Sequence, residues 1–202
     1  MIIDRGSDWP SWIQEQLNTF RNIFHYRNDQ TRLTTKAINT YYGEKRDFAY
    51  LTPKRRLEPS DLYPELQADY LHCVCAPDRL ASILDELASL NWNPKIVYEP
   101  IPDLCLPSEV ENLRKVIGRV HVFSPNHEEG QAFFGDGDGS GESIEKLCSE
   151  FVGMGAKRVI VRSGSLGSCG REKGGKVFWV RPYTTDQSKV VDPTGAGNAF
   201  LV

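Results

Sequence analysis

The sequence lacks the marks of several protein classes. Its 202 residues contain no run of about 18 apolar residues, the length that a membrane-spanning helix requires. Residues 1–10 contain neither the basic segment nor the apolar stretch of a signal peptide. The five cysteines are scattered and too few for a disulfide framework, which is typical of a reducing compartment. We therefore expect a cytoplasmic protein with no membrane partner.

The chain also has little excess charge of either sign. It contains 24 Lys and Arg residues and 27 Asp and Glu residues, which give a formal net charge of −3. Such a balance gives no electrostatic reason to expect a nucleic-acid partner. Hydrophobic residues make up 40% of the chain, enough for a sizeable core. The length suits one domain, or one large and one small domain.

Beyond residue 65 the sequence alternates between two kinds of pattern. It predicts strands at residues 70–76, 95–99, 119–123, 157–162, 176–180 and 189–191, and helices at 77–90, 108–117, 126–134, 143–154 and from 193 onward. Two glycines in residues 173–176 predict a hairpin turn. The alternation is typical of βαβ units on a mostly parallel sheet, where ligands bind at the carboxyl ends of strands. The junctions between strands and helices are therefore the candidate sites.

Residues 1–65 show a weaker pattern. The apolar spacing between residues 9 and 25 predicts an amphipathic helix. Residues 2–3 and 48–51 predict short strands, and the Thr-rich residues 32–40 suit a strand or a sheet edge.

One junction carries a glycine-rich turn. Asp192 follows a predicted strand, and Gly195, Ala196 and Gly197 lead into a helix that contains Asn198. Glycines let backbone N–H groups converge, and a helix N-terminus adds partial positive charge, so this turn could hold a phosphoryl group. The alternative is a tight turn that needs glycine for its geometry alone.

A second junction carries Asn126 and Glu129, which follow the predicted strand at 119–123. Their spacing of three places both side chains on one face of a helix. They could serve a ligand there, or they could be an N-cap and an acidic residue of the first turn. A third junction carries Arg162, Gly164 and Gly167 after the predicted strand at 157–162.

These three motifs, in their order along the chain (126–129, 162–167 and 192–198), resemble those of the PfkB, or ribokinase-like, carbohydrate kinases. The resemblance implies an α/β ribokinase-like fold with a mostly parallel sheet flanked by helices. Gly195, Ala196 and Gly197 would form the anion hole for the transferring phosphoryl group, and Asp192 would brace the turn. Asn198 stands where the family has the catalytic Asp that takes the proton of the substrate hydroxyl. An amide does not ionise and cannot act as that base.

The resemblance also implies a nucleotide and a metal ion. Arg162, Gly164 and Gly167 would lie along ATP. Arg162 stands where the family usually has Thr, and it could either meet a phosphate or block one. Asn126 and Glu129 would organise Mg2+ and its waters around the phosphates from the second shell, a role that suits oxygen ligands. The third partner would be a sugar or a nucleoside, whose identity the sequence leaves open together with the oligomeric state.

Residues 4–6 and 32–35 look most like a fungal subgroup of this family, associated with the maintenance of killer virus particles, that also carries Asn at the base position. Against the family pattern the chain looks truncated at both ends, without the N-terminal strands and lid and without the last helices. Residues 1–65 would be a remnant of the substrate half and residues 66–202 the nucleotide and phosphoryl half. The expected function is a carbohydrate kinase with weak or no activity; the alternative is a non-catalytic scaffold or binding protein.

Other motifs are weaker. The loop at 136–147 resembles the start of a calcium-binding loop, but Leu147 stands where a bidentate Glu is required. Cys73 and Cys75 would face one side of a strand and His72 the other, so a metal site is not expected there. No G-x-G-x-x-G follows the first clear strand, which disfavours a dinucleotide-binding fold.

Overall fold

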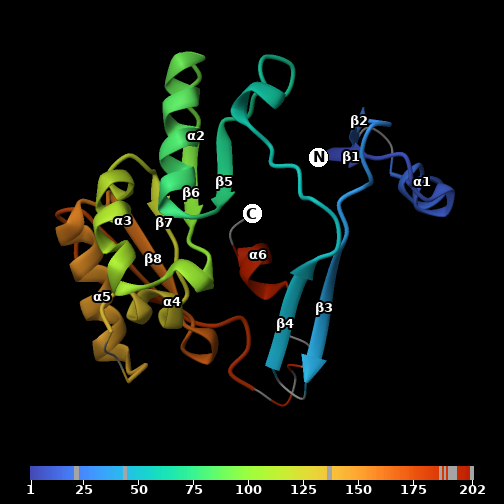
Figure 1. Ribbon diagram of the computed structural model, residues 1–202. Coiled ribbons are helices and arrows are strands. Elements are labelled where there is room, and N and C mark those ends of the chain that lie inside the picture. Colours follow the sequence, from blue (N-terminus) through green and yellow to red (C-terminus); the bar gives the residue numbers. More distant parts are fainter. Residues whose placement is uncertain are drawn as a thin grey trace. The chain divides into compact units, whose positions relative to one another are not determined.

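The computed structural model describes residues 1–20, 23–42, 45–135, 138–186, 188, 190 and 195–200 (Figure 1). It consists of two compact units, Met1–Leu57 and Glu58–Val202, each described by itself below. No helix in the described part of the chain has the length and apolar character needed to cross a bilayer.

The first unit contains two small sheets. Strands β1 (Ile2–Arg5) and β2 (His25–Asn28) pair in parallel, and β3 (Ala37–Tyr42) and β4 (Lys45–Tyr50) pair antiparallel. The Arg27 guanidinium donates two hydrogen bonds to the Asp4 carboxylate, at 2.7 and 2.9 Å, which ties β2 to β1. The hydrogen bond from Arg27 holds the pKa of Asp4 below its usual value, against the effect of partial burial.

The predicted helix between residues 9 and 25 is wrong in its second half. Helix α1 covers only Ser11–Leu17, and His25 already belongs to β2. The helix buries none of its residues, so packing does not favour its extension beyond Leu17. In the Thr-rich stretch, only the residues from Ala37 onward form a strand.

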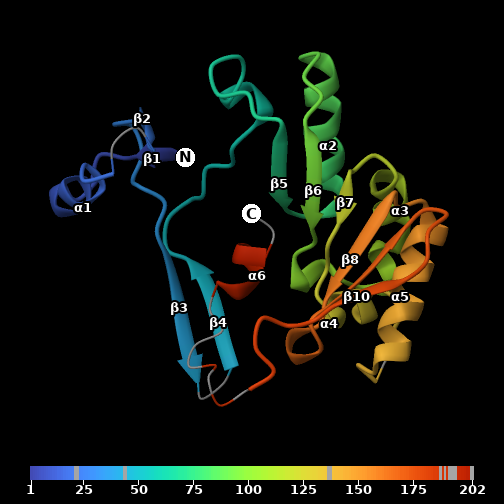
Figure 2. The same ribbon diagram turned by 180° about the vertical axis from the view of Figure 1, so that it is seen from behind.

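The second unit is built on one six-stranded sheet of order β10-β9-β8-β7-β6-β5 (Figure 2). The first four strands of this unit run parallel and the last two antiparallel: β5 (Tyr70–Val74), β6 (Lys95–Glu99), β7 (Val122–Phe123), β8 (Arg158–Arg162), β9 (Ser168–Glu172) and β10 (Phe178–Val180). The mostly parallel sheet is confirmed.

The hairpin turn at residues 173–176 is also confirmed, because it joins β9 to β10. Strand β9 was not predicted, since Ser168–Glu172 contains no β-branched or aromatic residue. The Phe178 ring packs over Gly170 of β9, where a Cβ would lie 2.3 Å from the ring and would displace it. The strand predicted at residues 189–191 falls largely outside the described residues.

Four helices connect the parallel strands or follow them: α2 (Pro77–Ser89), α3 (Val110–Ile117), α4 (His127–Ala132) and α5 (Gly141–Met154). Short 3-10 helices cover Pro59–Asp61, Pro102–Leu104, Pro107–Glu109 and Gly164–Leu166, and α6 (Ala196–Phe200) is the last described element. Helices α2, α3 and α5 lie on the same side of the sheet in both views (Figures 1 and 2). Every predicted helix of this unit is present with shifted ends, except that only residues 196–200 of the last one are described as helix.

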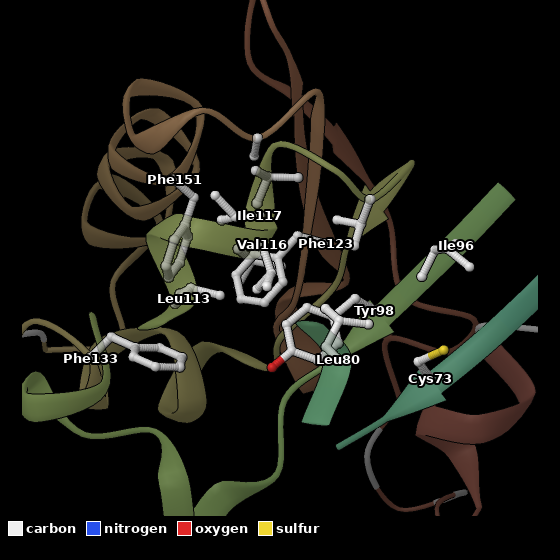
Figure 3. Packing of buried hydrophobic residues seen from close by; sticks show 14 of the residues in the cluster. Cys73, Leu80, Ile96, Tyr98, Leu113, Val116, Ile117, Phe123, Phe133 and Phe151 are labelled. Atoms are coloured by element: carbon white, nitrogen blue, oxygen red, sulfur yellow. The ribbon is translucent and has the colours of Figure 1, made fainter. Parts of the chain in front are cut away.

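The core lies between the sheet and these helices (Figure 3). Helix α2 buries Leu80, Leu84 and Leu87, which share one face at helical spacing. The Phe123 ring of β7 contacts the Phe151 ring of α5 edge to face, with centroids 4.9 Å apart. This packing holds the carboxyl ends of the parallel strands in fixed positions, where the candidate site lies.

Candidate functional site

The carboxyl ends of the parallel strands bring three charged or polar side chains together. Glu99 is the last residue of β6, Arg162 is the last residue of β8, and Asn126 follows β7 by three residues. The Arg162 N–H donates to the Pro125 carbonyl at 3.0 Å, and Asn126 and Arg162 form an isolated parallel bridge. The second and third sequence motifs are therefore neighbours at the carboxyl ends of β7 and β8.

The Arg162 guanidinium is the centre of this arrangement. Its Nη2 atom donates to Glu99 Oε1 at 2.5 Å and to the Ser124 carbonyl at 3.2 Å, and lies 3.5 Å from Glu129 Oε2. The side chains of Arg162, Glu99 and Glu129 are 13%, 12% and 6% exposed, so these charges are largely removed from water. Arg162 Nε is buried and has no hydrogen-bond acceptor among the described residues.

Asn126 and Glu129 form a reciprocal cap at the start of α4. The Glu129 N–H donates to Asn126 Oδ1 and the Asn126 N–H donates to Glu129 Oε2, both at 2.8 Å. The N-cap considered as an alternative role is therefore present. Burial raises the pKa of the Glu129 carboxyl, while the Asn126 N–H and the Arg162 charge act in the opposite direction.

The glycine-rich turn reaches the same guanidinium. Gly195 has a φ of 83°, a conformation that favours glycine, and it precedes α6 directly. A Cβ on residue 197 would lie 2.6 Å from Arg162 Nη1, so Gly197 lets the guanidinium approach the backbone. Asp192 and the side chain of Asn198 lie outside the described residues.

The two glycines after β8 differ in what they do. Gly164 begins the 3-10 helix Gly164–Leu166 with a φ of 51°, and a Cβ there would meet nothing within 4 Å. Gly167 has a φ of 91°, and a Cβ there would lie 2.1 Å from the Val180 carbonyl oxygen. Packing against the chain after β10 therefore accounts for Gly167 without a ligand.

Sequence reasoning missed Glu99 and His72 as members of this cluster. Glu99 Oε2 lies 3.1 Å from His72 Nε2, so this carboxylate contacts a side chain of β5 and one of β8. The available signal was a charged residue at the end of an otherwise apolar strand in a predicted parallel sheet, since such ends gather at one edge.

The described residues do not fit a divalent cation held by Asn126 and Glu129. Glu129 Oε2 and Asn126 Oδ1 each accept a backbone N–H, and a guanidinium already lies beside the Glu129 carboxylate. No cluster of three or more His, Cys, Asp or Glu side chains suited to a metal ion occurs in the described ranges. The Cys73 thiol is buried, which raises its pKa to about 11.

Comparison with known proteins identifies the family. The model of the pfkB family carbohydrate kinases matches residues 16–202. This chain belongs to that family. Protein MAK32 of Saccharomyces cerevisiae is 32% identical over 228 residues, covering 99% of this chain and 62% of the relative, which confirms the fungal resemblance. An uncharacterised Schizosaccharomyces pombe protein is 31% identical over 225 residues with the same coverage, so the chain spans about 62% of the length of both relatives.

Solved structures of ribokinase-like kinases share the fold. Ribokinase of Arabidopsis thaliana, solved with ribose and ATP, matches with a TM-score of 0.70 at 17% identity, over 99% of this chain and 65% of that one. Adenosine kinase of Anopheles gambiae, solved with a diadenosine tetraphosphate, matches with a TM-score of 0.67 at 20% identity, over 99% and 64%. The ribokinase-like fold of this PfkB chain is thereby confirmed.

Proposed function

We propose that this chain carries the nucleotide and phosphoryl site of an ATP-dependent carbohydrate kinase whose transfer step is weak or absent, because Asn198 replaces the catalytic base. The observation that carries the proposal is the convergence of three distant motifs on one side chain. Glu129 lies 3.5 Å from Arg162 Nη2, and the Gly197 backbone lies against Arg162 Nη1. Because the chain belongs to the PfkB family, we infer that these positions serve nucleotide binding and phosphoryl transfer.

The glycine turn would bind the phosphoryl group. The first N–H groups of a helix have no partner within it, so those of Ala196 and Gly197 can donate to phosphoryl oxygens as negative charge develops. Gly195 allows the turn that aims them, and Asp192 would brace it. Arg162, Gly164 and Gly167 would line the nucleotide beside them.

The step that we expect to be impaired is removal of the proton from the sugar hydroxyl. Asn198 can accept a hydrogen bond from the hydroxyl and orient it, but its amide cannot take the proton. A positioned general base contributes about 10²–10⁴-fold to such a reaction, which sets the expected loss. Asn126 and Glu129 do not fit as ligands of the Mg2+ that the resemblance implies, because Asn126 Oδ1 and Glu129 Oε2 accept backbone N–H groups and Arg162 lies beside the carboxylate, so we assign them no magnesium.

A phosphoryl-transfer assay with ATP and a panel of sugars and nucleosides tests the proposal. Asn198→Asp restores an ionisable group, and we expect it to raise turnover by about 10²-fold or more. Asn198→Ala is the matched control, because it removes the amide without adding a base and should stay at or below the wild type. Robust wild-type turnover that Asn198→Asp leaves unchanged would contradict the proposal.

The alternative is a non-catalytic ribokinase-like scaffold or binding protein. The observation that favours it is the Arg162 side chain, which is held by Glu99 and Ser124 at a position that the family uses for the nucleotide. A scaffold predicts no turnover in either Asn198 variant and no effect of ATP on thermal stability. A kinase-derived site predicts that ATP raises the melting temperature, because a ligand of the native state stabilises it.

A further inference from the structure

Arg162 lies between two carboxylates that come from different parts of the chain. Its Nη2 atom contacts both Glu99 and Glu129, at 2.5 and 3.5 Å. The charged groups that face this point are the two carboxylates, the guanidinium and His72, which contacts the far oxygen of Glu99. When both of these nearly buried carboxylates are ionised, they require a positive charge beside them, because two like charges removed from water repel each other strongly.

Two kinds of cation could meet that requirement. A magnesium ion needs six oxygen ligands near 2.1 Å and keeps several of them as water, which requires open space around the carboxylates. A guanidinium is planar, carries a permanent charge and sheds its hydration more easily than a small ion. At this site the guanidinium is present, and the carboxylate of Glu129 is also used by the Asn126 N–H.

We propose that the Arg162 guanidinium takes the place of a divalent cation between Glu99 and Glu129, so that this chain binds no divalent cation at that carboxylate pair. The inference uses the position of the family's second and third motifs and does not depend on whether the chain transfers phosphoryl groups. It also gives Arg162 a definite role, since its Nη1 atom remains directed at the Gly197 backbone while Nη2 makes the ion pairs.

The direct test is divalent-cation binding in the absence of nucleotide and sugar. Mn2+ binding is measured by electron paramagnetic resonance, and stabilisation by Mg2+ is measured as a shift of the melting temperature. Arg162→Thr removes the guanidinium and leaves both carboxylates. Arg158→Thr is the matched control on the same strand, because Arg158 pairs with Glu172 where both side chains are more exposed, at 36% and 54%.

We expect no saturable Mn2+ binding that depends on Glu129, either in the wild type or in Arg158→Thr. We expect Arg162→Thr to bind Mn2+ saturably, to be stabilised by Mg2+, and to lose both properties when Glu129→Gln is added. An Arg162→Thr chain that folds only when Mg2+ is supplied would agree with this, since the ion would replace the missing charge.

Either of two results would overturn the proposal. The first is Mn2+ binding by the wild type that Glu129→Gln abolishes, which would place a cation beside Arg162. The second is the absence of any cation effect on Arg162→Thr and also on Arg162→Gln, which likewise removes the charge but keeps a longer polar side chain. Because the titration contains no ATP, neither Mn2+ binding nor the melting temperature depends on whether the chain transfers phosphoryl groups.

Discussion

Replacing Arg162 with Met should destabilise this chain far more than removing an ordinary surface ion pair. The substitution keeps much of the side-chain volume and deletes the guanidinium, so that Glu99 and Glu129 lose their shared positive partner. The exposures of 13% and 12% show that the Arg162–Glu99 pair is largely but not fully buried. Breaking a buried pair from one side costs about 3–5 kcal/mol, and we expect a loss at the lower end of that range because Glu99 keeps its contact with His72.

The pairwise contribution comes from a double-mutant cycle with Glu99→Gln. That variant leaves Arg162 its contacts with Ser124 and Glu129, so we expect it to cost about 1–3 kcal/mol. The double variant should cost less than the two single losses combined, with a coupling energy of about 2 kcal/mol. The free energies of unfolding are measured by urea titration followed by circular dichroism.

The cycle of Arg158→Met and Glu172→Gln is the matched control. Both residues lie in the same hairpin of strands and form an ion pair with the same chemistry at greater exposure, so their coupling should stay below about 1 kcal/mol. Equal coupling energies in the two cycles would refute the claim that Arg162 and Glu99 form a desolvated pair.

Two further predictions concern backbone strain and thiol reactivity. Gly167→Ala should lower the free energy of unfolding by more than about 1 kcal/mol, and Gly174→Ala should lower it by less. Both residues have a positive φ, but only at Gly167 would a Cβ meet backbone atoms. Urea titration measures both losses, and equal losses would contradict this prediction. With a thiol reagent at pH 8 the half-buried Cys75 should react first, and Cys73 and Cys105 only after unfolding, because burial raises their pKa values to about 11 and 12 and the thiolate is the reactive form. Their reactivity should rise only as the pH approaches those values, and fast labelling of Cys73 at pH 8 would count against its burial.

The sequence was sufficient to predict the four parallel strands in the sheet of the second unit. Strands such as β6 and β8 are short apolar runs between helices with a clear apolar face, and both signals are local. Strand β9 carries no such signal, because its residues have low strand propensity. It forms because it pairs with β8 on one side and β10 on the other. Helix α1 shows the opposite error, since an apolar spacing without a surface to pack against did not extend the helix beyond Leu17.

Only part of the candidate site was predicted, again because sequence patterns indicate local features and not contacts between distant residues. Asn126 and Glu129 are three residues apart, so their cap is a local feature that the sequence could indicate. The ion pair between Glu99 and Arg162 joins residues 63 positions apart, and no local pattern records it. The sequence predicted Arg162 as a nucleotide-binding residue that departs from the family motif, but it did not indicate the two carboxylates, Glu99 and Glu129, that Arg162 contacts.

Calorimetric titration of this chain with ATP, once with Mg2+ and once with EDTA, tests the central claim most directly. The proposed nucleotide site lies at the carboxyl ends of the parallel strands, where the positive charge of Arg162 lies beside Glu99 and Glu129. This proposal predicts saturable binding of one ATP per chain whose affinity does not fall when EDTA removes the divalent cations. Absence of ATP binding under both conditions would contradict it and leave the non-catalytic scaffold.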